Sequence, residues 1–497
     1  MFDWVGKWAL TTPNKTALKE AETGRTLSYS EWNNQANTVV HYFSSIGLKK
    51  GDRIAILAEN CLEYFILFSV CQKMGTILVP LNYRLTSAEI NYLLNNASPD
   101  LLIVEDKFSQ LATATDYYSK LKHGISLSAF TAYCTQSETD LSKVQYPEAV
   151  SMEDPLFIIY TSGTTGHPKG ALYTHKMLFW NSINTTLRMD NTSESRSLVC
   201  MPLFHTGGWN VIGTPFIHRG AFICVQKTFE PALTLQLMQD ENISIFMAVP
   251  TMLKILADQP DFENADLSSV EYFMVGGESL PIPLIELWDK KGIPIRQGFG
   301  MTEAGPSLTS LHQTDCIRKI GSIGTPNFYV QIKIVDENGM EVGVNETGEM
   351  LVKGDMVLPG YWNNPEASKE AFTDGWFHTG DILMKDEEGF LYVKDRKKNM
   401  FISGGENVYP AEIEKYIYTH PQVAEVAVVA MKDERWGEVG HAYVVLKENI
   451  QLTADEIIEY CKKGLAKFKI PKTITFLNEL PKNAAGKTDK KLLTCNQ

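Results

Sequence analysis

The chain has 497 residues, of which 44% are apolar and 21% charged, so it is long enough for several domains and too ordinary in composition for bulk disorder. Its 46 Lys and Arg against 59 Asp and Glu give a net charge of −13, which disfavours nucleic-acid binding because such binding depends on cationic contacts to phosphate. The eight cysteines are scattered without a C-x-x-C pair, which indicates reduced thiols and argues against a zinc or redox motif.

The start of the chain shows no targeting signal. The sequence MFDWVGKW places an acidic residue before any basic one and lacks a long apolar segment. The most apolar helical stretch, residues 64–70, is far too short to cross a bilayer. We therefore expect a soluble cytoplasmic protein, and leave open whether it forms a homodimer or touches a membrane surface.

The first half of the chain alternates short apolar runs with helical patterns. Residues 54–57 and 77–80 are typical of strands, and residues 59–74 between them carry apolar side chains at helical spacing before Gly75. The same alternation recurs around 101–106 and again over 273–300. This pattern predicts parallel sheets with crossover helices.

The residue pattern of the sequence changes twice further along the chain. The polar stretch 131–151 predicts a surface connection, and the Asn-Gly and Gly pairs after Gly321 predict antiparallel hairpins. Beyond about residue 396, the apolar patterns predict a separate α+β unit. Its expected strands are 423–433, 441–447 and 473–480, and its expected helices are 410–420 and 454–468.

The sharpest local signal is YTSGTTGHPKG, residues 160–170, directly after the apolar run LFIIY. A loop dense in Gly, Ser and Thr offers backbone N–H groups and hydroxyls to phosphate oxygens, and Lys169 adds a positive charge. It is not a Walker A loop, because two residues separate Gly166 from Lys169 and Gly170 stands where Ser or Thr would hold magnesium. An ordinary glycine turn is the alternative, and eleven residues of this composition favour the phosphate loop.

Seven segments, in this order, resemble the motifs of the adenylate-forming superfamily, which includes acyl-CoA synthetases, peptide-synthetase adenylation domains and firefly luciferase. They are the loop above, MPLFHTGGWN (201–210), VGGESLP (275–281), GFGMTEAG (298–305), GWFHTGD (375–381), the segment 394–414 and PKNAAGK (481–487). The resemblance implies an α/β fold. A large N-terminal domain, 1–397, would contain doubly wound sheets plus a β-barrel-like part, and a small mobile α+β domain would follow over 398–497.

The resemblance also implies the reaction. A carboxylate attacks the α-phosphate of ATP to give an acyl-adenylate and pyrophosphate, and the thiol of coenzyme A then displaces AMP. The protein would thus be an acid–thiol ligase, an AMP-forming acyl-CoA synthetase, that uses ATP, Mg²⁺ and CoA.

Individual residues take roles from the resemblance. Lys487, His205, Thr302 and Glu303 are implied as catalytic, and Glu303 and Thr161 as magnesium ligands. The residues implied to bind ATP or CoA are Thr161, Ser162, Gly163, Thr164, Thr165, Gly166, Lys169, Gly277, Glu278, Ser279, Gly298, Phe299, Gly300, Met301, Thr302, Asp381, Arg396, Ser403, Gly404, Gly405 and Lys487.

The chemistry of these side chains fits their implied roles. Phe299 would stack on adenine, and Asp381 offers two acceptor oxygens to the ribose hydroxyls. Lys487 would lie between the acyl carboxylate and the α-phosphate, whereas Ser403 to Gly405 would form the path of the pantetheine arm. Lys398 falls at the hinge position of the family, and Asn399 follows where relatives more often carry Asp.

The acyl pocket is implied to begin at His205, Gly208 and Trp209. No aspartate near VGGESLP is available to pair with an ammonium, and Met274 and Val275 are apolar, which disfavours an amino-acid substrate. This pattern favours a medium- or long-chain fatty acid. The alternatives are an aryl- or coumarate-type CoA ligase and an enzyme that loads a carrier-protein pantetheine.

Two further features bear on function. A non-catalytic nucleotide-binding scaffold is disfavoured, because the five charged residues that the chemistry requires are all present, namely Lys169, Glu303, Asp381, Arg396 and Lys487. Residues 461–497 hold nine Lys and no Arg against Glu479 and Asp489. A basic C-terminal face of this kind would attract ATP, CoA or an anionic membrane.

Overall fold

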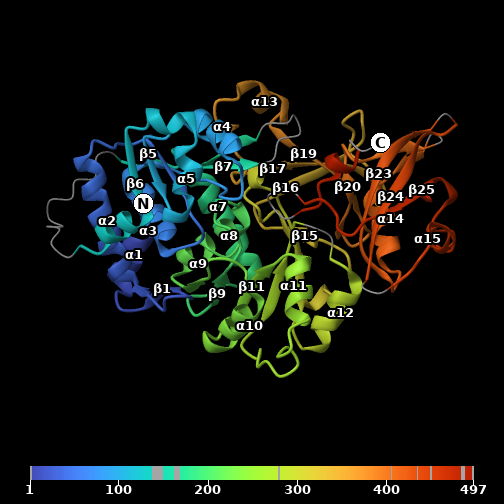
Figure 1. Ribbon diagram of the computed structural model, residues 1–497, viewed down its shortest axis with the longest axis horizontal. Helices are drawn as coiled ribbons and strands as arrows, with labels where there is room; N and C mark the ends of the chain where they lie inside the picture. Colours follow the sequence, from blue (N-terminus) through green and yellow to red (C-terminus); the bar gives the residue numbers. More distant parts are fainter. Residues whose placement is uncertain are drawn as a thin grey trace. The chain divides into compact units, whose positions relative to one another are not determined.

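The computed structural model describes residues 3–136, 149–161, 168–277, 280–403, 406–433, 435–447, 450–482 and 487–494 (Figure 1). The chain divides into two compact units. The first comprises residues 1–331 and 352–377, and the second comprises 332–351 and 378–497. The predicted boundary at residue 397 separates a large domain from a small domain that is expected to rotate against it. This boundary stays a prediction.

A six-stranded sheet of the first unit has the order β6–β5–β3–β4–β7–β8. Its strands are β3 (Arg53–Leu57), β4 (Ile77–Pro80), β5 (Leu101–Val104), β6 (His123–Ser126), β7 (Pro155–Thr161) and β8 (Lys169–Thr174). All neighbours are parallel except the β7–β8 hairpin. The order runs outward from β3 and β4 in both directions, which is the doubly wound arrangement that the sequence predicts.

A nine-stranded sheet of the same unit has the order β15–β14–β13–β12–β11–β9–β10–β1–β2. Its strands are β1 (Thr16–Glu20), β2 (Thr26–Ser28), β9 (Arg196–Val199), β10 (Phe222–Val225), β11 (Ile245–Ala248), β12 (Tyr272–Val275), β13 (Ile295–Phe299), β14 (Thr309–Ser310) and β15 (Thr325–Pro326). The chain turns to opposite sides of β9, since β10 lies on one side and β11 to β13 on the other. Ligands of such sheets bind where the strand order reverses, at the carboxyl ends of the strands.

Helices cover these sheets. They are α1 (Trp4–Thr11), α2 (Tyr29–Ser45), α3 (Leu62–Met74), α4 (Ser87–Ala97), α5 (Ser109–Thr113), α6 (Leu127–Cys134), α7 (His175–Met189), α8 (Thr206–Asn210), α9 (Thr214–Arg219), α10 (Pro231–Asp240), α11 (Pro250–Ala257), α12 (Ile282–Lys290) and α13 (Pro365–Glu370). Helices α10 to α12 share one core with β9 to β13. Helix α3 is buried along its whole length and contacts β1 of one sheet and β4 of the other. No helix of the described residues is long and apolar enough to span a membrane.

Two more sheets follow. One has the order β16–β17–β19–β18, with β20 paired to β19, and the other β22–β21–β24–β23, with β25 paired to β24. Their strands are β16 (Gln331–Val335), β17 (Thr347–Lys353), β18 (Phe372–Thr373), β19 (Trp376–Lys385), β20 (Leu391–Arg396), β21 (Phe401–Ser403), β22 (Glu406–Val408), β23 (Val423–Asp433), β24 (Gly437–Leu446) and β25 (Thr473–Phe476). Helices α14 (Pro410–Tyr418) and α15 (Ala454–Cys461) pack their apolar faces on the last sheet, and α16 (Lys490–Thr494) ends the described chain.

The element boundaries differ from the sequence predictions in physically simple ways. Helix α3 begins at Leu62 because Cys61 is its extended N-cap residue, and it ends at Gly75, which adopts the left-handed conformation. The polar stretch 131–151 is not wholly a connection, because α6 continues to Cys134; residues 137–148 lie outside the described residues. Helix α15 is shorter than the pattern over 454–468 predicts.

Trp209 lies at the centre of an aromatic cluster in the first unit. Its ring is fully buried, with ring centroids 5.2 Å from Phe65 and 5.8 Å from Phe68 of α3, and 5.2 Å from Phe157 of β7. Its Nε1 donates to the carbonyl oxygen of Leu203 at 2.6 Å. The contacts therefore join the segment after β9 to the helix and sheet beside it.

We predict that Trp209→Ala lowers the free energy of unfolding by about 3–5 kcal/mol, because the change removes a buried ring and leaves a cavity. Urea unfolding followed by circular dichroism measures the difference. Leu10→Ala, at a side chain that is 79% exposed, is the control and should change stability by no more than about 0.5 kcal/mol. Equal stability of the two variants would contradict the core position of Trp209.

Candidate active site

The two ends of the predicted phosphate loop are fixed by the β7–β8 hairpin. Thr161 and Lys169 are paired across its antiparallel strands. The loop residues between them, Ser162, Gly163, Thr164, Thr165 and Gly166, lie outside the described residues. The hairpin brings the two ends of the loop to one place at the edge of the six-stranded sheet.

Glu303 is the centre of a hydrogen-bonded cluster beside this hairpin. Its carboxylate oxygen Oε1 accepts from the hydroxyl of Thr161 at 3.3 Å and from the hydroxyl of Tyr361 at 3.1 Å. Glu303 is only 8% exposed, and its carbonyl oxygen accepts from the amide of Leu358 at 2.8 Å. The structure thus brings together Thr161 and Glu303, the two residues predicted as metal ligands, although they are 142 positions apart.

Tyr361 is a site residue that the sequence analysis missed. Burial raises the pKa of its hydroxyl above the ordinary range, and the charge and hydrogen bond of Glu303 raise it further. The hydroxyl therefore stays protonated and donates to Glu303. The Nζ atom of Lys169 lies 5.1 Å from the centre of the same ring, within the range of a cation–π contact.

This donor set fits a magnesium ion that is bound mainly through a nucleotide. Magnesium prefers hard oxygen donors and is commonly held by one or two carboxylates plus substrate phosphates. Glu303 supplies a buried carboxylate, and Thr161 and Tyr361 supply hydroxyl oxygens beside it. Among the described residues no group of three or more His, Cys, Asp or Glu could hold a metal on its own.

Gly298 and Phe299 are the last two residues of β13, and Gly300 and Met301 lead from them into the short 3₁₀ helix Thr302–Ala304. A Cβ on Gly300 would lie 1.6 Å from the carbonyl oxygen of Pro306, so this turn tolerates only glycine. Phe299 and Thr302 are half-buried at the carboxyl end of the sheet. Gly277 follows the neighbouring strand β12, whereas Glu278 and Ser279 lie outside the described residues. The adenine and phosphate contacts of these residues stay predictions.

The predicted acid gate follows β9 directly. His205 is half-buried, its ring lies 4.7 Å from that of Phe204, and Gly208 is buried in α8. Asn60, which the sequence analysis missed, fixes the preceding loop: its side chain accepts from the amide of Leu203 at 2.9 Å and donates to the carbonyl of Met201 at 3.0 Å. The described contacts of Trp209 belong to the core, and its place in an acyl channel stays a prediction.

In the second unit, β19 and β20 bring Asp381 and Arg396 together. The two residues are paired in register, and the Nε of Arg396 lies 2.7 Å from a carboxylate oxygen of Asp381. Asp381 is buried, whereas the side chain of Arg396 is 47% exposed, so the pair presents its cationic end outward. These two residues are therefore neighbours, and their contacts with a nucleotide stay predictions.

The predicted hinge residue Lys398 lies in the turn after β20. Burial and the nearby charges of Arg396 and Lys491 lower the pKa of its ammonium group. The buried carboxylate of Asp395 holds this turn, since it accepts from the Nδ2 of Asn399 at 3.0 Å and from the amide of Ala411 in α14 at 2.7 Å. An ionised aspartate at position 399 could not donate to Asp395 as the amide of Asn399 does.

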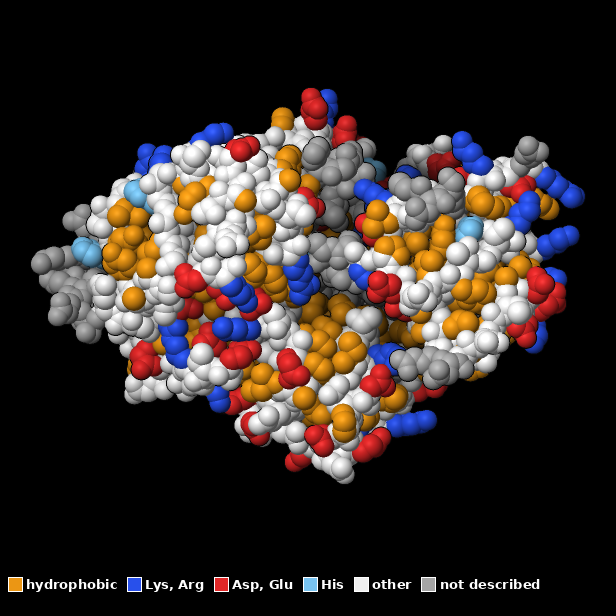
Figure 2. All heavy atoms as spheres, viewed as in Figure 1, with side chains coloured by type: hydrophobic (Ala, Val, Ile, Leu, Met, Phe, Trp, Pro, Cys, Tyr) orange, Lys and Arg blue, Asp and Glu red, His pale blue; other side chains and the backbone are white. Residues whose placement is uncertain are grey.

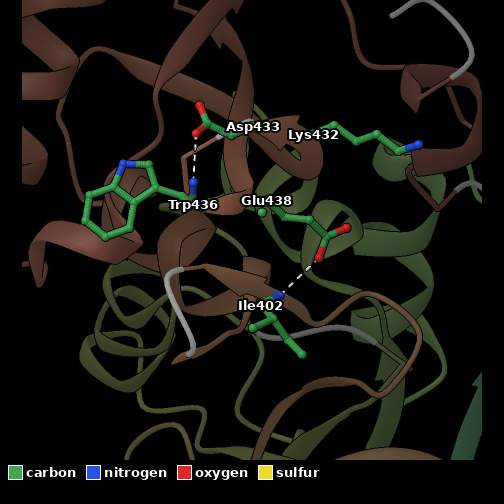
Figure 3. Close-up of a pocket in the computed structure, with 6 residues that line it drawn as sticks. Ile402, Lys432, Asp433, Trp436 and Glu438 are labelled. Carbon is green, nitrogen blue, oxygen red and sulfur yellow. Dashed lines mark hydrogen bonds between the residues drawn. The ribbon is translucent and has the colours of Figure 1, made fainter.

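A pocket of about 570 Å³ lies beside β21 in the second unit. It is lined by Ile402, Lys432, Asp433, Trp436, Gly437 and Glu438 (Figure 3). The amide of Ile402 donates to the carboxylate of Glu438 at 3.1 Å, which ties the pocket wall to the strand that ends at Ser403. Gly404 and Gly405 lie outside the described residues. The pocket therefore adjoins the segment predicted to form the thiol path.

The lysine-rich C-terminal segment is less basic than its sequence suggests. Within the described part of this segment, at least five lysines form ion pairs, and blue and red side chains lie intermixed over this part of the second unit (Figure 2). The pairs are Lys462–Glu459, Lys469–Glu412, Lys472–Asp433, Lys482–Glu425 and Lys490–Glu414. Lys487 is exposed. This segment therefore does not present a uniformly basic face.

Known proteins that resemble this chain do so over nearly its whole length. The model of AMP-binding enzymes matches residues 5–362, and that of the AMP-binding enzyme C-terminal domain matches residues 412–487. A feruloyl-CoA synthase of an Amycolatopsis species is 35% identical over 97% of this chain and 96% of its own. An indoleacetate–CoA ligase of Aromatoleum aromaticum is 36% identical, and a long-chain fatty-acid–CoA ligase of Mycobacterium tuberculosis 34%, each over 98% of this chain and 96% of its own.

Solved structures agree as well. The o-succinylbenzoate CoA synthetase of Bacillus subtilis, in complex with its acyl-adenylate intermediate, has a TM-score of 0.90 at 31% identity and covers 99% of this chain and 98% of its own. The same enzyme in complex with ATP and a magnesium ion has a TM-score of 0.89 at 31% identity, over 99% of each chain.

We predict that Glu303→Gln raises the magnesium concentration needed for half-maximal pyrophosphate release and lowers the maximal rate roughly 10²–10³-fold, because it removes the buried charge and keeps the shape. Tyr361→Phe removes only the hydroxyl and keeps the ring beside Lys169, so it should raise the magnesium requirement severalfold with a smaller loss of rate. A magnesium titration with each variant measures this. An unchanged requirement in Glu303→Gln would give Glu303 a purely structural role.

We predict that Lys487→Ala lowers the rate of acyl-adenylate formation roughly 10²–10³-fold, because the resemblance implies that this lysine donates to the developing charge on the phosphate. The same variant should still convert supplied acyl-adenylate and CoA to the thioester at a near-native rate. Lys482→Ala is the matched control, because its ammonium group pairs with Glu425 at the surface. Equal loss of both half-reactions in Lys487→Ala would contradict the role of this lysine.

Proposed function

From the premise that the chain belongs to the AMP-binding enzyme family and is an AMP-forming acid–CoA ligase, we propose that its acid carries an aromatic ring. The reaction proceeds in two steps. A carboxylate oxygen attacks the α-phosphorus of ATP and the bond to the β-phosphate breaks, which releases pyrophosphate. The thiol of CoA then attacks the acyl carbonyl, loses its proton to solvent, and AMP leaves.

The residues of the first unit serve the first step. The proposed magnesium ion supplies positive charge to the triphosphate when bound. Glu303, oriented by Thr161 and Tyr361, would hold it, and Lys169 adds a second cation beside the loop that is predicted to bind the phosphates. His205 lies at the start of the gate helix, where the acid carboxylate enters. In this proposal, cationic charge would lie beside the group on which negative charge develops.

The observation that carries the aromatic proposal is a pair of buried methionines beside the predicted gate, near the carboxyl ends of β11 and β12. A Cβ on Gly207 would lie 3.2 Å from the terminal methyl of Met247, so the thioether lies directly against the glycine backbone of α8. Met247 is paired in register with Met274, whose terminal methyl approaches Gly298 in the same way. Sulfur contacts with aromatic rings are worth about 0.3–1.5 kcal/mol, so thioethers beside bare backbone favour a flat ring.

The relatives support this choice. Feruloyl, indoleacetate and succinylbenzoate groups all contain an aromatic ring, and they are the acids named for three of the relatives above. A fatty acid is the second candidate. It is favoured by the 34% identical fatty-acid–CoA ligase and by the buried apolar side chains Ile212 and Phe216 after the gate.

A pyrophosphate-release screen tests the proposal. The panel contains hydroxycinnamic, arylacetic and benzoic acids and fatty acids of six to sixteen carbons, each with and without CoA. We expect the best aromatic acid to exceed the best fatty acid at least tenfold in kcat/KM. A fatty acid that exceeds every aromatic acid would overturn the aromatic assignment and leave the CoA-ligase activity in place.

One variant pair sharpens this screen. Met247→Ala enlarges the gate and should raise kcat/KM for a naphthyl acid relative to its phenyl analogue severalfold, with the KM for ATP unchanged. Met238→Ala is the matched control, because Met238 is a buried methionine of α10 in the core below the sheet. The control should lose stability without altering the ratio between the two acids.

A further inference from the structure

Asn181 bridges two backbone segments that carry different parts of the site. Its side chain is fully buried in α7. The Nδ2 donates to the carbonyl oxygen of Asn210 at 2.7 Å, and the Oδ1 accepts from the amide of Ser307 at 3.3 Å. Asn210 is the last residue of the gate helix α8, whereas Ser307 follows the loop of Glu303. One amide side chain therefore contacts both segments.

The bond to Asn210 reaches the acid gate. The side chain of Asn210 donates from Nδ2 to the hydroxyl of Thr206 at 3.0 Å, and its Oδ1 accepts from the hydroxyl of Thr214 at 3.1 Å. Thr206 is the first residue of α8 and follows His205 directly. Because α8 is only one turn long, its own backbone bonds fix it poorly, and Asn181 supplies a partner for its last carbonyl.

The bond to Ser307 reaches the loop of Glu303. The hydroxyl of Thr185, one turn along α7, donates to the hydroxyl of Ser307 at 2.7 Å. The intervening loop packs directly on Asn181, because a Cβ on Gly305 would lie 3.0 Å from the Cβ of Asn181. Gly305 has a positive φ of 47°, a conformation that disfavours other residues and brings the loop onto α7.

We propose that Asn181 is a positioning residue for adenylation, which holds the acid gate of α8 and the loop of Glu303 at a fixed separation. The resemblance implies that these two segments bind the carboxylate and the triphosphate, which must approach within bonding distance. A displacement of about 1 Å between reacting groups can cost roughly a hundredfold in rate. The proposal depends on the family reaction and holds for whichever acid the panel identifies.

The test compares Asn181→Ser with Asn184→Ala. Asn184 is a fully buried asparagine of the same helix, and its Oδ1 accepts from the amide of Tyr329 at 2.9 Å, away from the gate. Asn181→Ser should lower kcat for acyl-adenylate formation roughly 10- to 100-fold, with KM for acid and ATP changed less than about threefold. Thioester formation from supplied acyl-adenylate should stay near native, because acid and phosphate are then already joined. The control should keep both half-reactions near native.

Equal loss of both half-reactions in Asn181→Ser, or an equal loss of adenylation in Asn184→Ala, would overturn the proposal. Hydrogen exchange gives a readout that needs no acid: Asn181→Ser should accelerate exchange over both 206–210 and 305–308, and acceleration of only one segment would also overturn it. If Asn181→Ser does not fold, Gly305→Ala pushes the loop off the same amide and should split the half-reactions in the same way. If the aromatic proposal fails, the comparison of Asn181→Ser with Asn184→Ala can still be made, because it can use any acid that the enzyme activates.

Discussion

The parallel register of β9, β11, β12 and β13 is the constraint on which the site of the first unit depends. Parallel strands deliver their carboxyl ends to one edge of a sheet, so the segments that follow them emerge side by side. The gate segment with His205 follows β9, Gly277 follows β12, and the turn to Glu303 follows β13. The hairpin of the other sheet joins this edge through the hydrogen bond from Thr161 to Glu303, and Tyr361 donates to the same carboxylate.

Close backbone approach and buried hydrogen bonds hold these segments in place. Gly300 permits a turn that no larger residue fits, while the side chains of Asn60 and Asn181 satisfy backbone groups on either side of α8. A buried amide with both ends bonded is costly to disturb, because breaking either bond leaves a polar group without water. The geometry of the site is therefore maintained in part by Asn60 and Asn181, two side chains to which no substrate contact is assigned.

Local patterns predict the elements well and the long-range contacts poorly. The strand, helix and strand around α3 follow from apolar spacing and Gly75, and the resemblance identified Thr161, Glu303, Asp381 and Arg396. Tyr361 and Asn181 could not be predicted, because each acts through partners more than twenty residues away and carries no local signal. The number of lysines after residue 461 predicted a basic face. In the structure, carboxylates from other elements balance much of their charge.

The hydrogen bonds of the Asp395 carboxylate bear on how fast the predicted rotation at Lys398 could occur. Asp395 precedes Lys398 and Ala411 follows it, and both lie in the second compact unit, so a rotation about Lys398 of the kind that the resemblance implies would have to break the bond between them. A hydrogen bond to a charged group is worth about 1.5–3 kcal/mol, and the loss of that amount on the way to a transition state slows a step roughly 10- to 100-fold. Such a rotation would then be an activated step, and the loss of this one hydrogen bond would contribute to its barrier.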